Sequence, residues 1–361
     1  MAFFSGIFGG GEKKGGSVLG VDIGSSSLKV VQLRQAAGKA VLETYGELAL
    51  GPYAGKAVGL ATELSADAVA ATLKDLVREA SVTTKECGVS IPFARSLLTL
   101  VELPKGKNRE EQKTIIELEA RKYIPVPINE VQLDWFVVPE EGRRGAAENN
   151  RVEVLLVAVH NDELKLLDAA VKGADLHAKF FEIEIFSTIR AVVDEPVKPV
   201  MVLDIGAATT KAYVVEHGVV ALSHTIPHGG QDATRAIATE SGVPLARAEQ
   251  LKKEAGLGDG QGVKQSLELI FSGIFAEAKR VFLQYETQRS KTIARVVLTG
   301  GGGVTKALEQ YAQGLFEVPV KVADPFAKTE TPAFMRPVLE AIGPEFAVAV
   351  GIALRLLEES R

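Results

Sequence analysis

The chain is 361 residues long, carries a net charge of −5 and contains a single cysteine, Cys87. This length predicts two or more domains rather than one core, and the mild negative charge argues against a nucleic-acid-binding protein. A single cysteine excludes an internal disulfide, which fits a reducing compartment, and we interpret Cys87 as a small core residue. No apolar run approaches the roughly 20 residues that span a bilayer, so no transmembrane segment is expected.

Residues 1–16 are predicted to form a flexible N-terminal tail. Aromatic residues at its start are followed by three glycines and then by Lys13 and Lys14. A signal peptide carries its basic residues before a longer apolar part, so this segment is not expected to be one. A weak contact with a membrane surface and a docking peptide are the alternatives.

The stretch from Ser17 to Leu33 reads as two apolar strands joined by a polar turn. The turn carries Asp22, Gly24, three serines and Lys29. Glycine lets a ligand approach the backbone, and serine hydroxyls and backbone N–H groups suit phosphate oxygens. Asp22 is placed to hold water on a divalent cation, because magnesium takes oxygen ligands and keeps several waters. Taken alone, the pattern is also typical of an ordinary hairpin.

The next segment completes a mixed α/β domain over residues 17–94. Residues 40–48 alternate as a third strand would, and a fourth strand is predicted over 86–92. Between them, Ser65 can cap a helix whose apolar positions from Val69 to Ala80 recur at helical spacing. Three strands, a helix and a strand are the opening of such a domain.

Residues 95–175 are predicted to form a small inserted domain with the order β-α-β-β-α-β. Strands are expected over 95–104, 131–138, 151–160 and 178–185, and helices over 109–123 and 162–172. Prolines at 125 and 127 end the first helix, and the polar stretch 139–150 is expected to be a hairpin loop with disorder. His160 and His177 have no partners at metal-ligand spacing, so both are interpreted as structural.

The strand over 178–185 should return to the first domain, which residues 176–197 would help to complete. Alternation along that strand would place Glu182 and Glu184 on one face. If that face looks at a nucleotide, either residue could orient an attacking water, and the two are therefore candidate catalytic residues. A solvated strand end is the alternative.

A second copy of the first hairpin begins at Val200, about half a chain later. Its Asp204, Gly206, Thr209, Thr210 and Lys211 stand in the places of Asp22, Gly24, Ser27, Leu28 and Lys29. Two such hairpins predict a duplicated domain, with 198–344 as the second copy and both turns facing one phosphate chain.

Helices follow in the second copy, forming a helical subdomain at about 229–290. Gly229 and Gly230 open the first helix, where backbone N–H groups would point at an anion. Glu249 and Lys252 lie three residues apart on the second helix, over 243–254, and are therefore neighbours. They form either a surface ion pair or a contact with a ribose and base. A long helix is predicted over 267–289.

Four consecutive glycines, at 300–303, follow a strand that begins at Arg295. Ordering such a run loses much backbone entropy, so a flat group such as an adenine, or a phosphate, is expected to approach it. The last helix, over 345–359, carries Ala347, Ala349 and Gly351, which permit close packing. We expect it to complete the first domain.

The two Asp-x-Gly turns, the late Thr-Gly-Gly-Gly and the closing alanine–glycine helix resemble the superfamily of actin, sugar kinases and heat-shock chaperones. The segment from Glu119 to Trp135 resembles a hallmark of the PilM family of type IV pilus assembly proteins, and residues 228–232, 248–252 and 346–355 resemble the same family. The resemblance implies an α/β, actin-like, two-lobed fold built from duplicated ribonuclease-H-like domains, with a small α+β insert domain.

The resemblance also implies ATP and Mg²⁺ in the cleft between the lobes. The residues so implied are Gly24, Ser25, Ser26 and Lys29 for the first phosphate loop; Asp204, Gly206, Thr209 and Thr210 for the second; Asp22 and Asp204 for Mg²⁺, held through water; Gly229 and Gly230 near the phosphates; Glu249 and Lys252 beside the ribose; and Gly300, Gly301 and Gly302 at the adenosine. Residues 228–232 lack the acid pair often found after these glycines, so at most slow hydrolysis is expected.

For partners, the resemblance implies the N-terminal cytoplasmic peptide of the inner-membrane protein PilN, held by the first domain and the insert. Pilus motor ATPases and self-association are further suggestions. The protein would be cytoplasmic and would reach the inner membrane only through its partners. An FtsA-like cytoskeletal filament and a small-molecule kinase or phosphatase are the alternatives. A filament calls for a C-terminal amphipathic anchor, which is not expected in a sequence that stops at Arg361, and a kinase needs an acidic base beyond Asp22 and Asp204.

Overall fold

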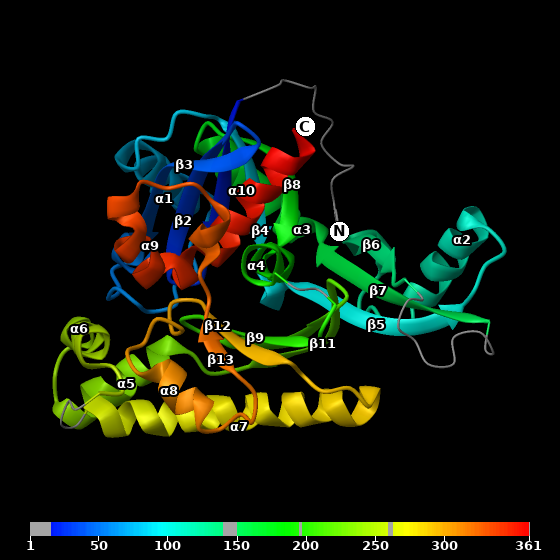
Figure 1. The fold of residues 1–361 in the computed structure, drawn as a ribbon. Coiled ribbons are helices and arrows are strands. Elements are labelled where there is room, and N and C mark those ends of the chain that lie inside the picture. Colours follow the sequence, from blue (N-terminus) through cyan, green and yellow to red (C-terminus); the bar gives the residue numbers. More distant parts are fainter. Residues whose placement is uncertain (1–15, 140–149, 195–196, 259–262, 361) are drawn as a thin grey trace.

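The computed structural model describes residues 16–139, 150–194, 197–258 and 263–360. The predicted tail, apart from Gly16, and the centre of the predicted loop 139–150 lie outside the described residues. Two lobes, each built on a five-stranded sheet, lie next to one another, and a smaller unit projects from the side of the first lobe (Figure 1).

The first lobe has a sheet with the strand order β3-β2-β1-β4-β8. β1, β2 and β3 are antiparallel neighbours, whereas β1, β4 and β8 run parallel. On one face of β3, the Tyr45 ring packs against Phe346, near the C-terminal helix. On the opposite face, a Cβ atom at Gly46 would lie 3.0 Å from Leu76 Cδ1 of α1 (Ala66–Glu79). Helices therefore cover both faces of this sheet. Its strands are β1 (Ser17–Ile23), β2 (Ser27–Ala36), β3 (Lys39–Ala49), β4 (Glu86–Ile91) and β8 (His177–Ile183).

The second lobe repeats this plan with the order β11-β10-β9-β12-β13. Its first three strands are again antiparallel neighbours, and β9, β12 and β13 are parallel. The duplication predicted from the two hairpins is therefore confirmed. The elements are β9 (Val200–Ile205), β10 (Thr210–Glu216), β11 (Val219–Ile226), α5 (Gly230–Ser241), α6 (Leu245–Ala255), α7 (Val263–Arg289), β12 (Arg295–Thr299), α8 (Leu308–Gln313) and β13 (Val320–Val322).

Helix α1 (Ala66–Glu79) begins where the sequence predicted it. Ser65 caps it, because its hydroxyl accepts a hydrogen bond from the Ala68 N–H at 3.3 Å. The predicted apolar stripe is buried at Val69 and Leu73, which join the core of the first lobe.

Helix α10 (Ala347–Glu359) packs directly on the backbone of its neighbours. A Cβ atom at Gly20 of β1 would lie 2.0 Å from the Ala349 carbonyl oxygen, and one at Gly351 would lie 1.9 Å from the Ser187 carbonyl oxygen. The close packing of α10 therefore requires the small residues from which it was predicted. Although α10 follows the second lobe in sequence, it lies in the first (Figure 1).

The predicted strand over 178–185 is wrong at its end, because β8 stops at Ile183 and α4 (Glu184–Val192) begins at the next residue. Ile185, Ile189 and Val192 recur at helical spacing, and a short run of β-branched residues concealed that period. Glu182 and Glu184 therefore lie on different elements and do not share a face.

The projecting unit is a three-stranded antiparallel sheet with the order β5-β7-β6, covered by α2 (Arg109–Ala120). Its strands are β5 (Ser96–Pro104), β6 (Val131–Val137) and β7 (Arg151–His160). Helix α3 (Asn161–Gly173), which the prediction placed in the insert, packs against α1 and β8 instead. Its buried Leu167 and Val171 belong to the first-lobe core, so the last two elements of the predicted β-α-β-β-α-β order are not part of the insert.

Among the residues that the structure describes, one segment, Ala333–Glu359, is long and apolar enough to cross a membrane, contrary to the expectation from the sequence. It comprises η5 (Ala333–Met335), α9 (Arg336–Ile342), η6 (Gly343–Phe346) and α10. In its most apolar window 61% is buried inside the protein, so we interpret it as core. The remaining short helices are η1 (Gly51–Ala54), η2 (Phe93–Arg95), η3 (Ile128–Glu130) and η4 (Pro325–Lys328).

Candidate functional site

A cavity of about 650 Å³ lies between the two lobes. The turn after β1 and the turn after β9 both line it, and α6 and the segment that leads into α10 complete its walls. The lining includes most of the residues predicted from the sequence: Asp22, Gly24, Ser25, Ser26, Lys29, Glu184, Asp204, Gly206, Thr209, Gly230, Glu249, Lys252, Gly300, Gly301 and Gly302.

The first turn presents a buried aspartate and a buried lysine to the cavity. Asp22 pairs with Lys29 across β1 and β2, and its Oδ1 accepts a hydrogen bond from the Ser90 hydroxyl at 2.9 Å. Burial raises the pKa of Asp22 to about 6, against the opposing charge of Lys29. Lys29 Nζ donates to the Ser27 hydroxyl at 2.7 Å and lies 3.2 Å from Glu47 Oε1.

The second turn carries the same pair, but its lysine is engaged differently. Asp204 pairs with Lys211 across β9 and β10. Lys211 Nζ lies 3.4 Å from Asp204 Oδ2 and 3.0 Å from Oε2 of Glu184, which belongs to α4 of the first lobe. Burial alone would lower the pKa of Lys211, but Asp204 and Glu184 raise it above the ordinary lysine value. A charged ammonium therefore joins the two lobes at the cavity.

Glu184 has both carboxylate oxygens engaged. Oε1 accepts a hydrogen bond from the Phe93 N–H at 2.7 Å, and Oε2 accepts one from Lys211. Of the two candidate catalytic residues, Glu184 lines the cavity, but these contacts oppose its use as a free base.

The glycines after β12 have different surroundings. Gly300 has a φ of +77°, and a Cβ atom there would lie 2.4 Å from Asp204 Oδ1. A Cβ atom at Gly302 would lie 2.2 Å from Ile205 Cγ2. At Gly301 the nearest atom outside its chain neighbours is Glu345 Cδ, at 4.0 Å, so this glycine leaves room for a ligand on the cavity side.

Glu249 and Lys252 of α6 form a buried pair, so the interpretation as a surface ion pair is wrong. Lys252 Nζ lies 2.6 Å from Glu249 Oε2, and the Thr234 hydroxyl donates to the same oxygen at 2.6 Å. Burial lowers the pKa of Lys252 despite its acidic partner. The nearly buried pair lines the cavity.

A loop of the first lobe, residues 55–63, reaches the second lobe beside this pair; we call it the mouth loop. The Ala61 N–H donates to Gln231 Oε1 of α5 at 3.2 Å. Gly59, with a φ of +87°, lies so close to Glu249 that a Cβ atom would be 2.6 Å from its Cδ. The mouth loop therefore bridges the two lobes.

Thr210 and Gly229, although predicted site residues, do not line the cavity. Thr210 is fully buried and donates to the His228 carbonyl at 2.9 Å. Gly229 packs on the backbone of Gly206 and Ala207, where a Cβ atom would lie 2.6 Å from either carbonyl oxygen. Both residues support the backbone of the second turn without lining the cavity.

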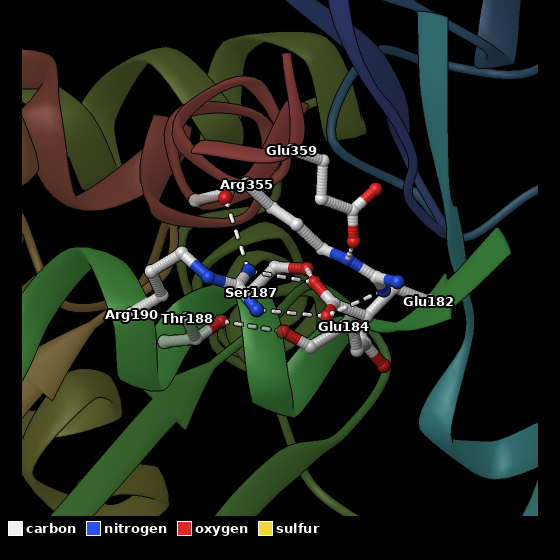
Figure 2. Close-up of polar contacts among 8 residues, drawn as sticks. Glu182, Glu184, Ser187, Thr188, Arg190, Arg355 and Glu359 are labelled. Atoms are coloured by element: carbon white, nitrogen blue, oxygen red, sulfur yellow. Dashed lines mark hydrogen bonds and ion pairs between the residues drawn. The ribbon is translucent and has the colours of Figure 1, made fainter. Parts of the chain in front are cut away.

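Glu182 does not line the cavity either, and it is fully buried in the first lobe. Arg190 of α4 binds its two oxygens at 2.8 and 2.9 Å, and Arg355 Nη1 of α10 lies 3.0 Å away (Figure 2). Arg355 also stacks over the Phe180 ring at 3.8 Å. Glu182 is thus the centre of an ion network that joins β8, α4 and α10, and the expectation that it could orient water is wrong.

Sequence reasoning missed four charged residues of the cavity: Glu47, Lys211, Lys253 and Glu345. Lys211 stood in the repeated turn pattern, and its register with Asp204 was the available signal. Glu47 and Glu345 come from a half-buried strand and a short helix with no recognisable motif. Burial and the charge of Glu47 raise the pKa of Glu345.

The lining fits a nucleotide. Its volume is within the range of ligand sites, two phosphate-type turns line it, and Gly301 leaves open space for a flat group. The residues fit Mg²⁺ less well, because Lys211 already lies against Asp204. Across the described part of the chain, no three acidic, histidine or cysteine side chains gather as a metal site would require.

Comparison with known proteins gives concordant results. A family model described as type IV pilus assembly protein PilM matches residues 20–357. Cell division protein FtsA of Neisseria meningitidis serogroup B is 24% identical over 317 residues, which cover 76% of this chain and 76% of that protein. FtsA of Pseudomonas aeruginosa is 22% identical over 362 residues, covering 87% and 84% respectively.

Solved structures agree. A PilM-PilN type IV pilus biogenesis complex is 25% identical with a TM-score of 0.80, covering 94% of this chain and 98% of that one. Ethanolamine utilization protein EutJ from Carboxydothermus hydrogenoformans is 15% identical, with a TM-score of 0.55 and coverages of 95% and 91%. MreB5 of Spiroplasma citri bound to AMPPNP is 12% identical, with a TM-score of 0.52 and coverages of 95% and 96%. The last two establish similarity of fold alone.

Proposed function

Because this chain belongs to the PilM family of type IV pilus assembly proteins, among the actin-like ATPases, we propose that it is a nucleotide-binding component of a type IV pilus assembly platform. Its α/β, two-lobed fold is the actin-like fold that the sequence predicted. The observation that carries the proposal is the similarity to a PilM-PilN complex over 94% of this chain.

We assign the cavity between the lobes to ATP. The turns at Gly24 and Gly206 would hold the phosphates together with Lys29 and Lys211, and Gly301 would meet the adenosine. Hydrolysis is at most slow on this proposal, because Glu184, the acid nominated as a base, is held by Lys211 and by a backbone N–H. The nucleotide would act by changing how the lobes lie against one another.

We assign the partner role to the first lobe and the insert. The solved relative is a complex with PilN, and we propose that this chain likewise holds the N-terminal cytoplasmic peptide of a PilN partner. The protein would then lie at the cytoplasmic face of the inner membrane through that partner.

The ATP assignment can be tested with Gly301→Val. A side chain there would enter open space in the cavity and meet no protein backbone, so folding should be unaffected while ATP is excluded. Isothermal titration calorimetry should show ATP binding to the wild type and at least about a tenfold loss, equal to ~1.4 kcal/mol, in the variant. Gly273→Ala on α7, where a Cβ atom meets nothing within 4 Å, is the matched control. Unchanged affinity in Gly301→Val would contradict the assignment.

The partner assignment calls for a mapping experiment on the whole chain. A synthetic N-terminal peptide of the PilN partner is titrated into the protein, and hydrogen exchange is compared with and without it. Protection is expected in residues 96–138 and 151–160 and in the adjoining first lobe. Protection confined to the second lobe, or equal protection by a scrambled peptide, would argue against this surface.

A further inference from the structure

The Lys211 ammonium lies against Asp204, one of the two aspartates predicted to hold a divalent cation through water. Asp22 and Asp204 were expected to hold Mg²⁺ between the two turns. Instead, Lys211 Nζ lies between carboxylates of both lobes, 3.4 Å from Asp204 Oδ2 and 3.0 Å from Glu184 Oε2. All three side chains are nearly buried, with exposed fractions of 13% for Lys211, 9% for Asp204 and 11% for Glu184. The chain itself therefore places a positive charge at this point.

We propose that Lys211 takes the place of the divalent cation in this nucleotide site, so that the chain binds ATP without a metal ion held by the protein. The inference rests on the proposed nucleotide-binding function. It concerns one residue, Lys211, whose contacts the repeated turn pattern alone does not explain.

The donor geometry of lysine supports this role. An ammonium has three N–H donors, and the contacts with Glu184 and Asp204 use two of them, which leaves the third for a phosphate oxygen. A bound Mg²⁺ needs a nearly octahedral shell of oxygen ligands and retained waters. Beside Asp204, an ammonium already occupies that space and would repel a dication.

The first turn shows that this arrangement is not an automatic result of the repeat. Lys29 has the same register relative to Asp22 that Lys211 has relative to Asp204. Lys29 Nζ, however, contacts Ser27 and Glu47, and its charge acts on Asp22 without a hydrogen bond. Of these two lysines, only Lys211 contacts both the aspartate of its own turn and an acid of the opposite lobe.

The test compares ATP binding in excess Mg²⁺ with binding in excess EDTA, by calorimetry. For the wild type we expect dissociation constants within about threefold of each other, a difference of ~0.7 kcal/mol. Lys211→Met keeps the length of the side chain but removes its charge, and should lose at least about tenfold in affinity in EDTA. Lys211→Arg keeps the charge and should behave as the wild type does. Wild-type binding that disappears in EDTA would overturn the inference while leaving the proposed function intact.

A second measurement needs no nucleotide. Mn²⁺ is titrated into the nucleotide-free protein, and the free ion is followed by electron paramagnetic resonance. The inference predicts no stoichiometric binding. One bound Mn²⁺ that is lost in both Asp22→Asn and Asp204→Asn would overturn it. Because this result does not depend on ATP, it decides the inference even if ATP fails to bind, which would refute the proposed function separately.

Discussion

Replacing Glu182 with glutamine should destabilise the first lobe at neutral pH. The substitution keeps the shape of the side chain but removes the charge shared by Arg190 and Arg355. It therefore leaves two arginines facing a buried neutral amide in place of their common carboxylate (Figure 2).

The expected cost can be worked from burial. Removing one partner of a buried ion pair typically costs about 3–5 kcal/mol, because the remaining charge is uncompensated. Glu182 is fully buried and Arg355 is 3% exposed, but Arg190 is 17% exposed and can recover some hydration. Arg355 also keeps its contact with Glu359 at 2.8 Å. We therefore expect the lower end of the range, about 3 kcal/mol.

Glu359→Gln is the matched control, because it removes a carboxylate from the same network at a position that is 40% exposed. Exposed pairs contribute about 0–1 kcal/mol, so this variant should cost less than ~1 kcal/mol. Urea unfolding should be followed by hydrogen exchange in α4 and α10, since the sole tryptophan, Trp135, lies in the insert and reports on a different unit. An equal cost for the two variants would refute the reasoning from burial.

Three further predictions concern the same lobe. Burial would raise the pKa of Glu182, but its arginine partners hold that pKa below the ordinary 4.5. The stability that Glu182 contributes to the lobe should be complete above pH 4.5 and be lost as the pH falls through the lower folded-state pKa. Acid unfolding monitored by circular dichroism should therefore be less steep in Glu182→Gln. Gly351→Ala should lower the melting temperature at a cost of at least about 1–3 kcal/mol, because its Cβ would lie 1.9 Å from the Ser187 carbonyl oxygen, whereas Gly273→Ala should not. Burial raises the pKa of Cys87 to about 12, so a thiol reagent should label it only as fast as the lobe opens; rapid labelling of the folded protein would contradict this.

Much of the fold could be predicted because its signals are local. The two Asp-x-Gly turns each lie between apolar strands, and pairing of those strands fixes where Asp22 and Asp204 lie. The Ser65 cap and the small residues of α10 likewise act on their immediate surroundings. These signals predicted the hairpins of both sheets and the two turns that line the cavity, whereas the roles of Glu249 and Lys252 were implied by the family resemblance.

The predictions from sequence failed where tertiary contacts, rather than local sequence, decide where a residue lies. Helix α4 is short and rich in β-branched residues, so its period was hidden and Glu182 was assigned to the wrong surface. No spacing in the sequence pairs Lys211 with Glu184, because the two belong to different lobes. Glu47 likewise gains its importance only when β3 is laid beside β2, opposite Lys29.

The position of α10 has a consequence for how the protein is made. This helix covers Gly20 of β1 and Gly88 of β4, yet the ribosome reaches it only after every strand of the second lobe. Domains generally fold as units during synthesis, with segments that emerge first folding first. Here the second lobe can complete its sheet while the nascent first lobe still lacks the helix that seals it. The lobe that is begun first is therefore finished last, with its apolar strands in need of protection until translation of α10 ends.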